Sequence, residues 1–96
     1  MNLGITIKNL RKQRGQTQTE FATLCGITQT YLSQIENNQK DPNLSTLGNI
    51  SRHLNLPIPI LFFLTLDEND VSEDKRKTFM IMAPAIKSFI NELFTI

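Results

Sequence analysis

The stretch Thr17-Gln-Thr-Glu-Phe-Ala-Thr-Leu-Cys-Gly-Ile-Thr-Gln-Thr-Tyr-Leu-Ser-Gln-Ile-Glu-Asn37 decides the fold of this chain. It predicts two short helices joined by a tight turn at Gly26. Thr17 is placed to begin the first helix, because Glu20 stands three residues later and the pair can form a capping box. Thr28 can cap the second helix. The apolar residues of both helices are expected to face inward, which leaves the second helix with a polar outer face.

The polar face of the second helix suits the major groove of duplex DNA. A glutamine at the start of such a helix can form a bidentate hydrogen bond to N6 and N7 of adenine, and Gln29 stands at that place. The predicted base-reading residues are Gln29, Thr30, Ser33 and Gln34. For the last three, contact with a base and contact with phosphate or solvent are equally open.

The length and the charge of the chain limit the classes of protein to which it can belong. The 96 residues suffice for one domain, or for a small domain with an appendage. Residues 1–64 carry six Lys or Arg against three Asp or Glu, a net charge of +3. Residues 65–96 carry four against six, a net charge of −2. Attraction to phosphate is therefore confined to the first part, which predicts salt-sensitive binding that needs more than one protomer.

Several other classes of protein are excluded or disfavoured. A single cysteine rules out an intramolecular disulfide framework and a cysteine-based zinc site. The start of the chain lacks a signal-peptide core, and the apolar run from Leu56 to Leu66 is too short to span a bilayer. Cys25 is expected in the core and His53 in solvent. The sequence thus predicts a cytoplasmic protein without membrane contact, metal, cofactor or enzymatic activity.

The flanking residues complete a helical domain. Ile5 to Arg14 has one apolar stripe among basic residues and predicts a helix. Leu44 to Leu54 predicts another, with apolar residues at positions 44, 47, 50 and 54 expected to be buried and with Asn43 as its cap. A short helix with Pro59 in its first turn is expected to end near Leu64. The prediction is a five-helix, all-α domain over residues 1–64.

The remainder divides into an acidic linker, residues 65–74, and a helical segment, residues 75–96. Apolar residues of that segment follow a heptad spacing of 3, 4, 3, 4 and 3: Phe79, Met82, Ile86, Phe89, Leu93 and Ile96. Pro84 predicts a kink or a break into two abutting helices. The seam predicts a dimerisation element, and packing on residues 1–64 of the same chain is the alternative.

Four motifs resemble the lambda-repressor-like (Cro/C1-type, XRE) helix-turn-helix regulators. They lie within residues 4–64 and are Ile7-Lys-Asn-Leu-Arg-Lys-Gln-Arg-Gly15, Thr17-Gln-Thr-Glu-Phe-Ala22, Gly26-Ile-Thr-Gln-Thr-Tyr-Leu-Ser-Gln-Ile-Glu-Asn37 and Pro42-Asn-Leu-Ser-Thr-Leu47. The resemblance implies five helices, the third reading the major groove. Two positions depart from the pattern. Gln16 stands where an apolar residue is usual, and Asn38 replaces a glycine, although asparagine tolerates the left-handed conformation.

The resemblance also implies contacts to the DNA backbone. Gln18, at a helix N-terminus, would touch phosphate and brace the first glutamine of the recognition helix. Asn37 and Lys40 lie where the family meets the backbone. Tyr31 is open between a phosphate contact, a thymine neighbour and packing on the preceding helix.

Arg11 and Glu36 look like the ion pair that ties the first helix to the third in such domains. If the pair is partly buried, breaking it would leave a lone charge and cost on the order of 3 kcal/mol. Arg11 is therefore expected to be structural rather than a DNA contact.

These observations predict a sequence-specific regulator that binds double-stranded DNA as a homodimer on a near-palindromic operator, probing it with the third helix. The alternative is an antitoxin-like or accessory regulator whose C-terminal helix docks a different protein. A pure interaction domain without DNA binding is the third possibility.

Overall fold

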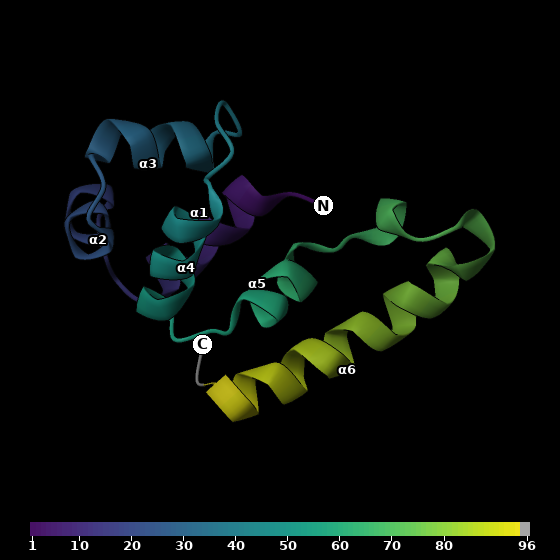
Figure 1. The fold of residues 1–96 in the computed structure, drawn as a ribbon. Coiled ribbons are helices and arrows are strands. Elements are labelled where there is room, and N and C mark those ends of the chain that lie inside the picture. Colours follow the sequence, from purple (N-terminus) through teal and green to yellow (C-terminus); the bar gives the residue numbers. More distant parts are fainter. Residues whose placement is uncertain (95–96) are drawn as a thin grey trace.

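The computed structural model describes residues 1–94, and every regular element in this range is helical, as the sequence predicted (Figure 1). The elements are α1 (Leu3–Gln13), α2 (Gln18–Cys25), α3 (Gln29–Glu36), α4 (Leu44–His53), α5 (Ile58–Thr65), the short 3₁₀ turns η1 (Glu68–Asp70) and η2 (Glu73–Lys75), and α6 (Arg76–Phe94). None of the helices in residues 1–94 has the length and apolar character required to cross a membrane.

Local hydrogen bonds define the segment from α2 to α3. Thr17 Oγ1 accepts the N–H of Glu20 at 3.1 Å, and the N–H of Thr17 donates to Glu20 Oε1 at 3.0 Å, which completes the predicted capping box. Gly26 ends α2 with φ 70°, in the left-handed region. Thr28 Oγ1 then accepts the N–H of Tyr31 at 3.0 Å and begins α3. The two-helix prediction for this stretch is confirmed.

The core lies between α1, α2, α3, α4 and α5, which pack on one another. Its buried members come from all five helices and from the turn before α5: Ile7, Leu10, Phe21, Ala22, Cys25, Leu32, Ile35, Leu47, Ile50, Leu54, Leu56 and Leu61. Burial of these side chains is the main stabilising contribution to the domain.

One predicted core residue is not in the core. Leu44 was expected on the buried face of its helix, but it is 74% exposed. It occupies the first position of α4, and the buried part of that helix begins one turn later at Leu47. Of the adjacent pair Leu24 and Cys25, it is Cys25 that is buried.

Helix α6 runs without interruption through Pro84 (Figure 1), so the predicted break into two abutting helices is wrong, while the alternative of a kink stays a prediction. A proline within a helix removes one N–H and leaves the carbonyl four residues earlier without its partner. Pro84 and Met80 are both exposed, so water can satisfy that carbonyl. The helix therefore tolerates the proline at this position.

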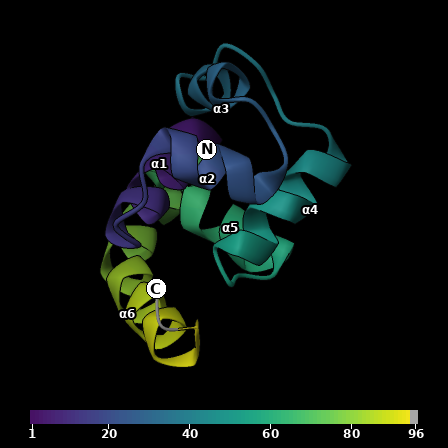
Figure 2. The same ribbon diagram turned by 90° about the vertical axis from the view of Figure 1, so that its left-hand side faces the viewer.

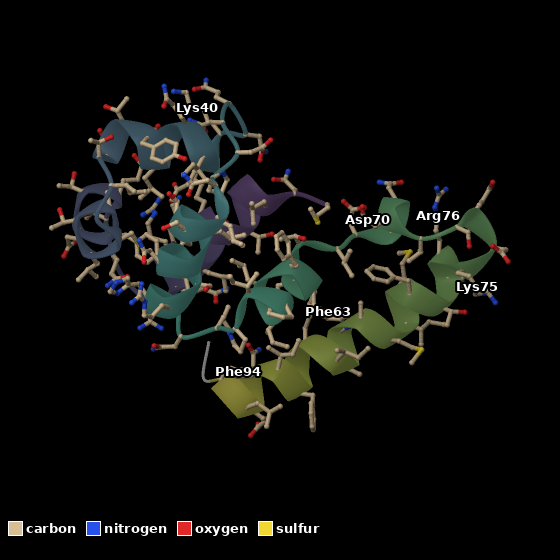
Figure 3. All side chains as sticks on the ribbon, viewed as in Figure 1. Lys40, Phe63, Asp70, Lys75, Arg76 and Phe94 are labelled. Carbon is tan, nitrogen blue, oxygen red and sulfur yellow. The ribbon has the colours of Figure 1, made fainter. Side chains whose placement is uncertain are left out.

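Helix α6 packs back on the domain through one side only. Ala83 and Ile90 are buried, and Phe94 packs against the core. Figures 1 and 2 both show α6 at the end of the molecule opposite α3. Figure 3 shows Phe63 of α5 and Phe94 of α6 in the space between these two helices.

The structure divides the predicted heptad seam. Phe79 is half-buried, whereas four seam residues are 38–64% exposed: Met82, Ile86, Phe89 and Leu93. These four form what we call the α6 stripe. Ile96 lies outside the described residues.

Residues 65–74 make contacts with the N-terminal residue of the chain and with the first residue of α6. The amino group of Met1 lies 2.7 Å from Asp70 Oδ2 and 3.5 Å from Asp67 Oδ2. The hydrogen bond from this amino group is the main reason that the pKa of Asp70 lies below its usual range. Arg76 Nε donates to the carbonyl of Glu68 at 3.1 Å. The segment is thus attached to the start of α1 and to the start of α6.

Candidate nucleic-acid interface

Helix α3 lies at one end of the molecule (Figures 1 and 2), and its outer face carries polar residues. Leu32 and Ile35 of this helix are fully buried against the core. The remaining positions leave a polar surface whose members are exposed or half-buried: Gln29, Thr30, Ser33 and Gln34. The structure therefore brings the four predicted base-reading residues onto one accessible helix surface.

Gln29 does not stand alone at the start of α3. Its Nε2 donates to Gln18 Oε1 at 2.8 Å, and Gln18 Nε2 donates to Glu36 Oε1 at 3.0 Å. Gln18 is the first residue of α2. The contact brings the start of α2 against the start of α3, so the two glutamine side chains form one polar surface.

The Arg11–Glu36 contact is a buried, bidentate ion pair. Arg11 Nε lies 2.7 Å from Glu36 Oε2, and Arg11 Nη2 lies 3.0 Å from Glu36 Oε1. The two side chains are 6% and 1% exposed. Arg11 Nη1 also donates to the carbonyl of Gln16 at 2.7 Å, a contact that sequence reasoning missed. One arginine therefore fastens α1 both to α3 and to the residue before the capping threonine of α2.

The predicted backbone-contacting residues differ in their surroundings. Tyr31 is half-buried and packs against the core. Asn37 and Lys40 are exposed after the end of α3, and Figure 3 shows Lys40 at the same end of the molecule as that helix. Asn37 Nδ2 donates to Ser33 Oγ at 3.5 Å, a long hydrogen bond. The side chain of Lys40 is thus accessible to solvent.

Sequence reasoning also missed a contact between the ends of α1 and α3. Asn38 has φ 58°, in the left-handed region, and its Oδ1 accepts the N–H of Gly4 at 3.1 Å. Its Nδ2 donates at 3.0 Å to Asn2 Oδ1, which also caps α1. The only available signal was a glycine within the first helix, where this residue type is unfavourable.

The nucleophilic side chain in the domain is poorly suited to chemistry. Cys25 is buried, and this burial raises the pKa of its thiol to about 11. A thiol needs to ionise to act as a nucleophile or a metal ligand. In the part of the chain that the structure describes, no three His, Cys, Asp or Glu side chains gather as a metal site would require.

This chain is similar to known proteins in sequence and in fold. The chain is 42% identical over 59 residues to the ImmF control region 10 kDa protein of Bacillus phage phi105, covering 62% of this chain and 66% of that protein. It is 35% identical over 72 residues to the transcriptional regulator SinR of Bacillus licheniformis, covering 74% and 61%. A solved complex of the SinR and SinI proteins superposes with a TM-score of 0.60 and 28% identity, over 90% of this chain and 98% of that one.

The chain spans less than two thirds of the length of these curated relatives. A helix-turn-helix family model matches residues 7–61, which is more than half of the chain and includes α2 and α3. The resemblance drawn from the motifs is confirmed: the chain belongs to the helix-turn-helix family of XRE-type, DNA-binding transcription regulators.

Proposed function

We propose that this protein binds a near-palindromic operator as a homodimer and regulates transcription as a repressor or controller. Helix α3 enters the major groove, where Gln29, Thr30, Ser33 and Gln34 meet base edges. Gln18, Asn37 and Lys40 meet the backbone. The observation that carries the proposal is the surface of α3 itself, on which polar side chains converge while Leu32 and Ile35 hold the helix to the core.

The phage protein and SinR support a regulatory role, since their names describe a control region and a transcriptional regulator. The charge distribution supports it as well. Residues 1–64, which include α3, carry the net positive charge, so attraction to phosphate acts on this part of the chain. Affinity is expected to fall steeply with salt because bound counterions are released from the DNA.

The α6 stripe supports the homodimer. Met82, Ile86, Phe89 and Leu93 are spaced by 4, 3 and 4 residues, the spacing by which two helices interlock side chains. Exposed apolar surface of this kind marks an interaction site. Because α6 lies opposite α3 (Figure 1), a partner seated on the stripe leaves α3 uncovered for DNA.

The test of DNA binding is selection from a random pool of duplexes at moderate salt, with sequencing of the bound fraction. We expect enrichment of a two-fold-symmetric motif with half-sites about one helical turn apart, roughly 10 base pairs. A folded protein that enriches no motif would contradict the proposal.

The test of the dimer is light scattering of the wild type and of two charged variants. Phe89→Glu places a charge within the α6 stripe and is expected to give a monomer. Ile81→Glu is the matched control, because Ile81 is 69% exposed on the same helix but outside the stripe. It is expected to remain dimeric, and equal dissociation of both variants would contradict the assigned interface.

A second candidate function keeps DNA binding but makes α6 a docking site for a different protein. One solved neighbour, which covers 90% of this chain, is itself a complex of two proteins, SinR and SinI. This candidate would be favoured over the homodimer if the wild type is monomeric in light scattering and its α6 stripe binds a hydrophobic dye.

A further inference from the structure

We infer that Glu36, held by Arg11, sets the direction in which Gln29 presents its amide to a base pair. The contacts form one chain that begins at the buried ion pair and ends at the exposed start of α3. Arg11 and Glu36 are thus positioning residues for base readout. The inference rests on the proposed DNA binding.

The series of hydrogen bonds begins at the carboxylate of Glu36, a group that can only accept hydrogen bonds. The carboxylate of Glu36 takes two hydrogen bonds from Arg11, at 2.7 and 3.0 Å, and its side chain is almost wholly buried. A carboxylate has no hydrogen to donate. Any amide that contacts Glu36 must therefore turn its NH₂ group, and not its oxygen, toward the carboxylate.

Gln18 is the amide in that position. Its Nε2 donates to Glu36 Oε1 at 3.0 Å, which directs its Oε1 to the other side, where it accepts from Gln29 Nε2 at 2.8 Å. If the Gln18 amide turned over, its oxygen would lie against the carboxylate and its NH₂ against the NH₂ of Gln29. Both contacts are repulsive, so Glu36 determines the direction of both amides.

The direction matters at the edge of a base. Gln29 uses one of its two amide hydrogens on Gln18. Its other hydrogen and its oxygen stay free, one donor and one acceptor in a set order. Adenine offers an N6 donor beside an N7 acceptor, which this order can match. An amide turned over would present the two groups in reverse order along the groove, and the match in the same pose would be lost.

The experiment measures base preference rather than affinity alone. The wild type, Glu36→Gln and Gln18→Ala are titrated with the duplex that the wild type selects from a random pool and with all its single-base-pair variants. The position read by Gln29 is the one at which Gln29→Ala loses preference. At that position we expect each variant to lower the preference by about tenfold. At every other position the affinity ratios should change by less than about twofold.

A glutamine at position 36 can turn either end of its amide toward Gln18, so Glu36→Gln removes the constraint while keeping the shape of the side chain. Gln18→Ala interrupts this series of hydrogen bonds but leaves the Arg11–Glu36 pair intact. The test therefore stays valid if Glu36→Gln is too unstable. Combining Gln18→Ala with Gln29→Ala should change the preference no further than Gln29→Ala alone. A loss that is uniform across all positions in both variants would mean a purely structural role and would overturn the inference.

A measurement without DNA separates this inference from the proposed function. In the free protein, the side-chain amide hydrogens of Gln29 should exchange with solvent more slowly than those of Gln13, which is exposed on α1. In Gln18→Ala the two rates should be alike. Equal rates in the wild type would overturn the amide chain even if DNA binding is found, and slow exchange with no selected motif would overturn only the proposed function.

Discussion

The side chain of Asn38, just after the end of α3, accepts a hydrogen bond from the backbone N–H of Gly4 in α1. Its Oδ1 lies 3.1 Å from the Gly4 nitrogen, and its backbone adopts a left-handed φ of 58°. A Cβ at position 4 would lie 2.5 Å from this oxygen and 2.6 and 2.7 Å from the carbonyl oxygens of Ile35 and Glu36. Helices α1 and α3 therefore approach so closely that only glycine fits between them.

We expect Gly4→Ala to destabilise the protein, because the two carbonyl oxygens belong to the backbone of α3 and cannot move aside alone. The cost should be roughly 1–3 kcal/mol or more, as for overpacking in a core. Chemical denaturation measures it. Gly48→Ala is the control, since a Cβ at this position in α4 meets no atom within 4 Å. It should stabilise by roughly 0.5–1 kcal/mol, and a Gly4→Ala variant that behaves like it would contradict the close approach.

Gln16→Leu should stabilise the protein. Gln16 Oε1 is buried and has no hydrogen-bond partner among the described residues, and its position is one where the family resemblance leads us to expect an apolar side chain. A buried polar atom without a partner costs about 1–3 kcal/mol. Because the substitution removes this unpaired atom, we expect the melting temperature of the variant to be higher than that of the wild type. The backbone carbonyl of Gln16, which Arg11 contacts, is unchanged by the substitution. A lowered melting temperature would show that the amide is satisfied in solution.

Gln29→Ala and Lys40→Ala should weaken DNA binding in different ways. Loss of a bidentate base contact should cost roughly 1–3 kcal/mol at one base position and relax the preference there. Loss of a phosphate contact should weaken all sequences alike and reduce the slope of log affinity against log salt by about 1. Titrations of a panel of duplexes at several salt concentrations distinguish the two. Identical behaviour of Gln29→Ala and the wild type on every duplex would remove Gln29 from the readout.

Cys25 should resist thiol reagents at neutral pH in the folded protein and react at once in denaturant. Burial raises the pKa of its thiol from 9.0 to about 11, so the folded state holds this proton more tightly than the unfolded state. The contribution of the thiol to stability is complete below pH 9.0 and is lost as the pH rises to about 11. Denaturation midpoints of the wild type and Cys25→Ala across this range test the sign. As the pH rises, the free energy of unfolding of the wild type should fall relative to that of Cys25→Ala.

The sequence by itself determined the features that are made within a few residues. The hydroxyl of Thr17 and the carboxylate of Glu20 cap α2 in a local exchange of hydrogen bonds, and Gly26 supplies the left-handed residue that ends it. Such features are visible in a sequence because both partners are close neighbours in the chain. The helical periodicity of α3 likewise separated its buried from its polar residues in advance.

Only the tertiary structure decided how the α6 helix shares its apolar surface. The apolar residues of this helix include Ala83 and Ile90, which are buried, as well as Phe89 of the predicted heptad seam, which is exposed on the α6 stripe. The same holds for the contact of Gly4 with Asn38, whose members are 34 residues apart. Periodicity states that a face is apolar, but what covers it depends on the direction in which distant helices pack. That direction follows from the whole core and from no local signal.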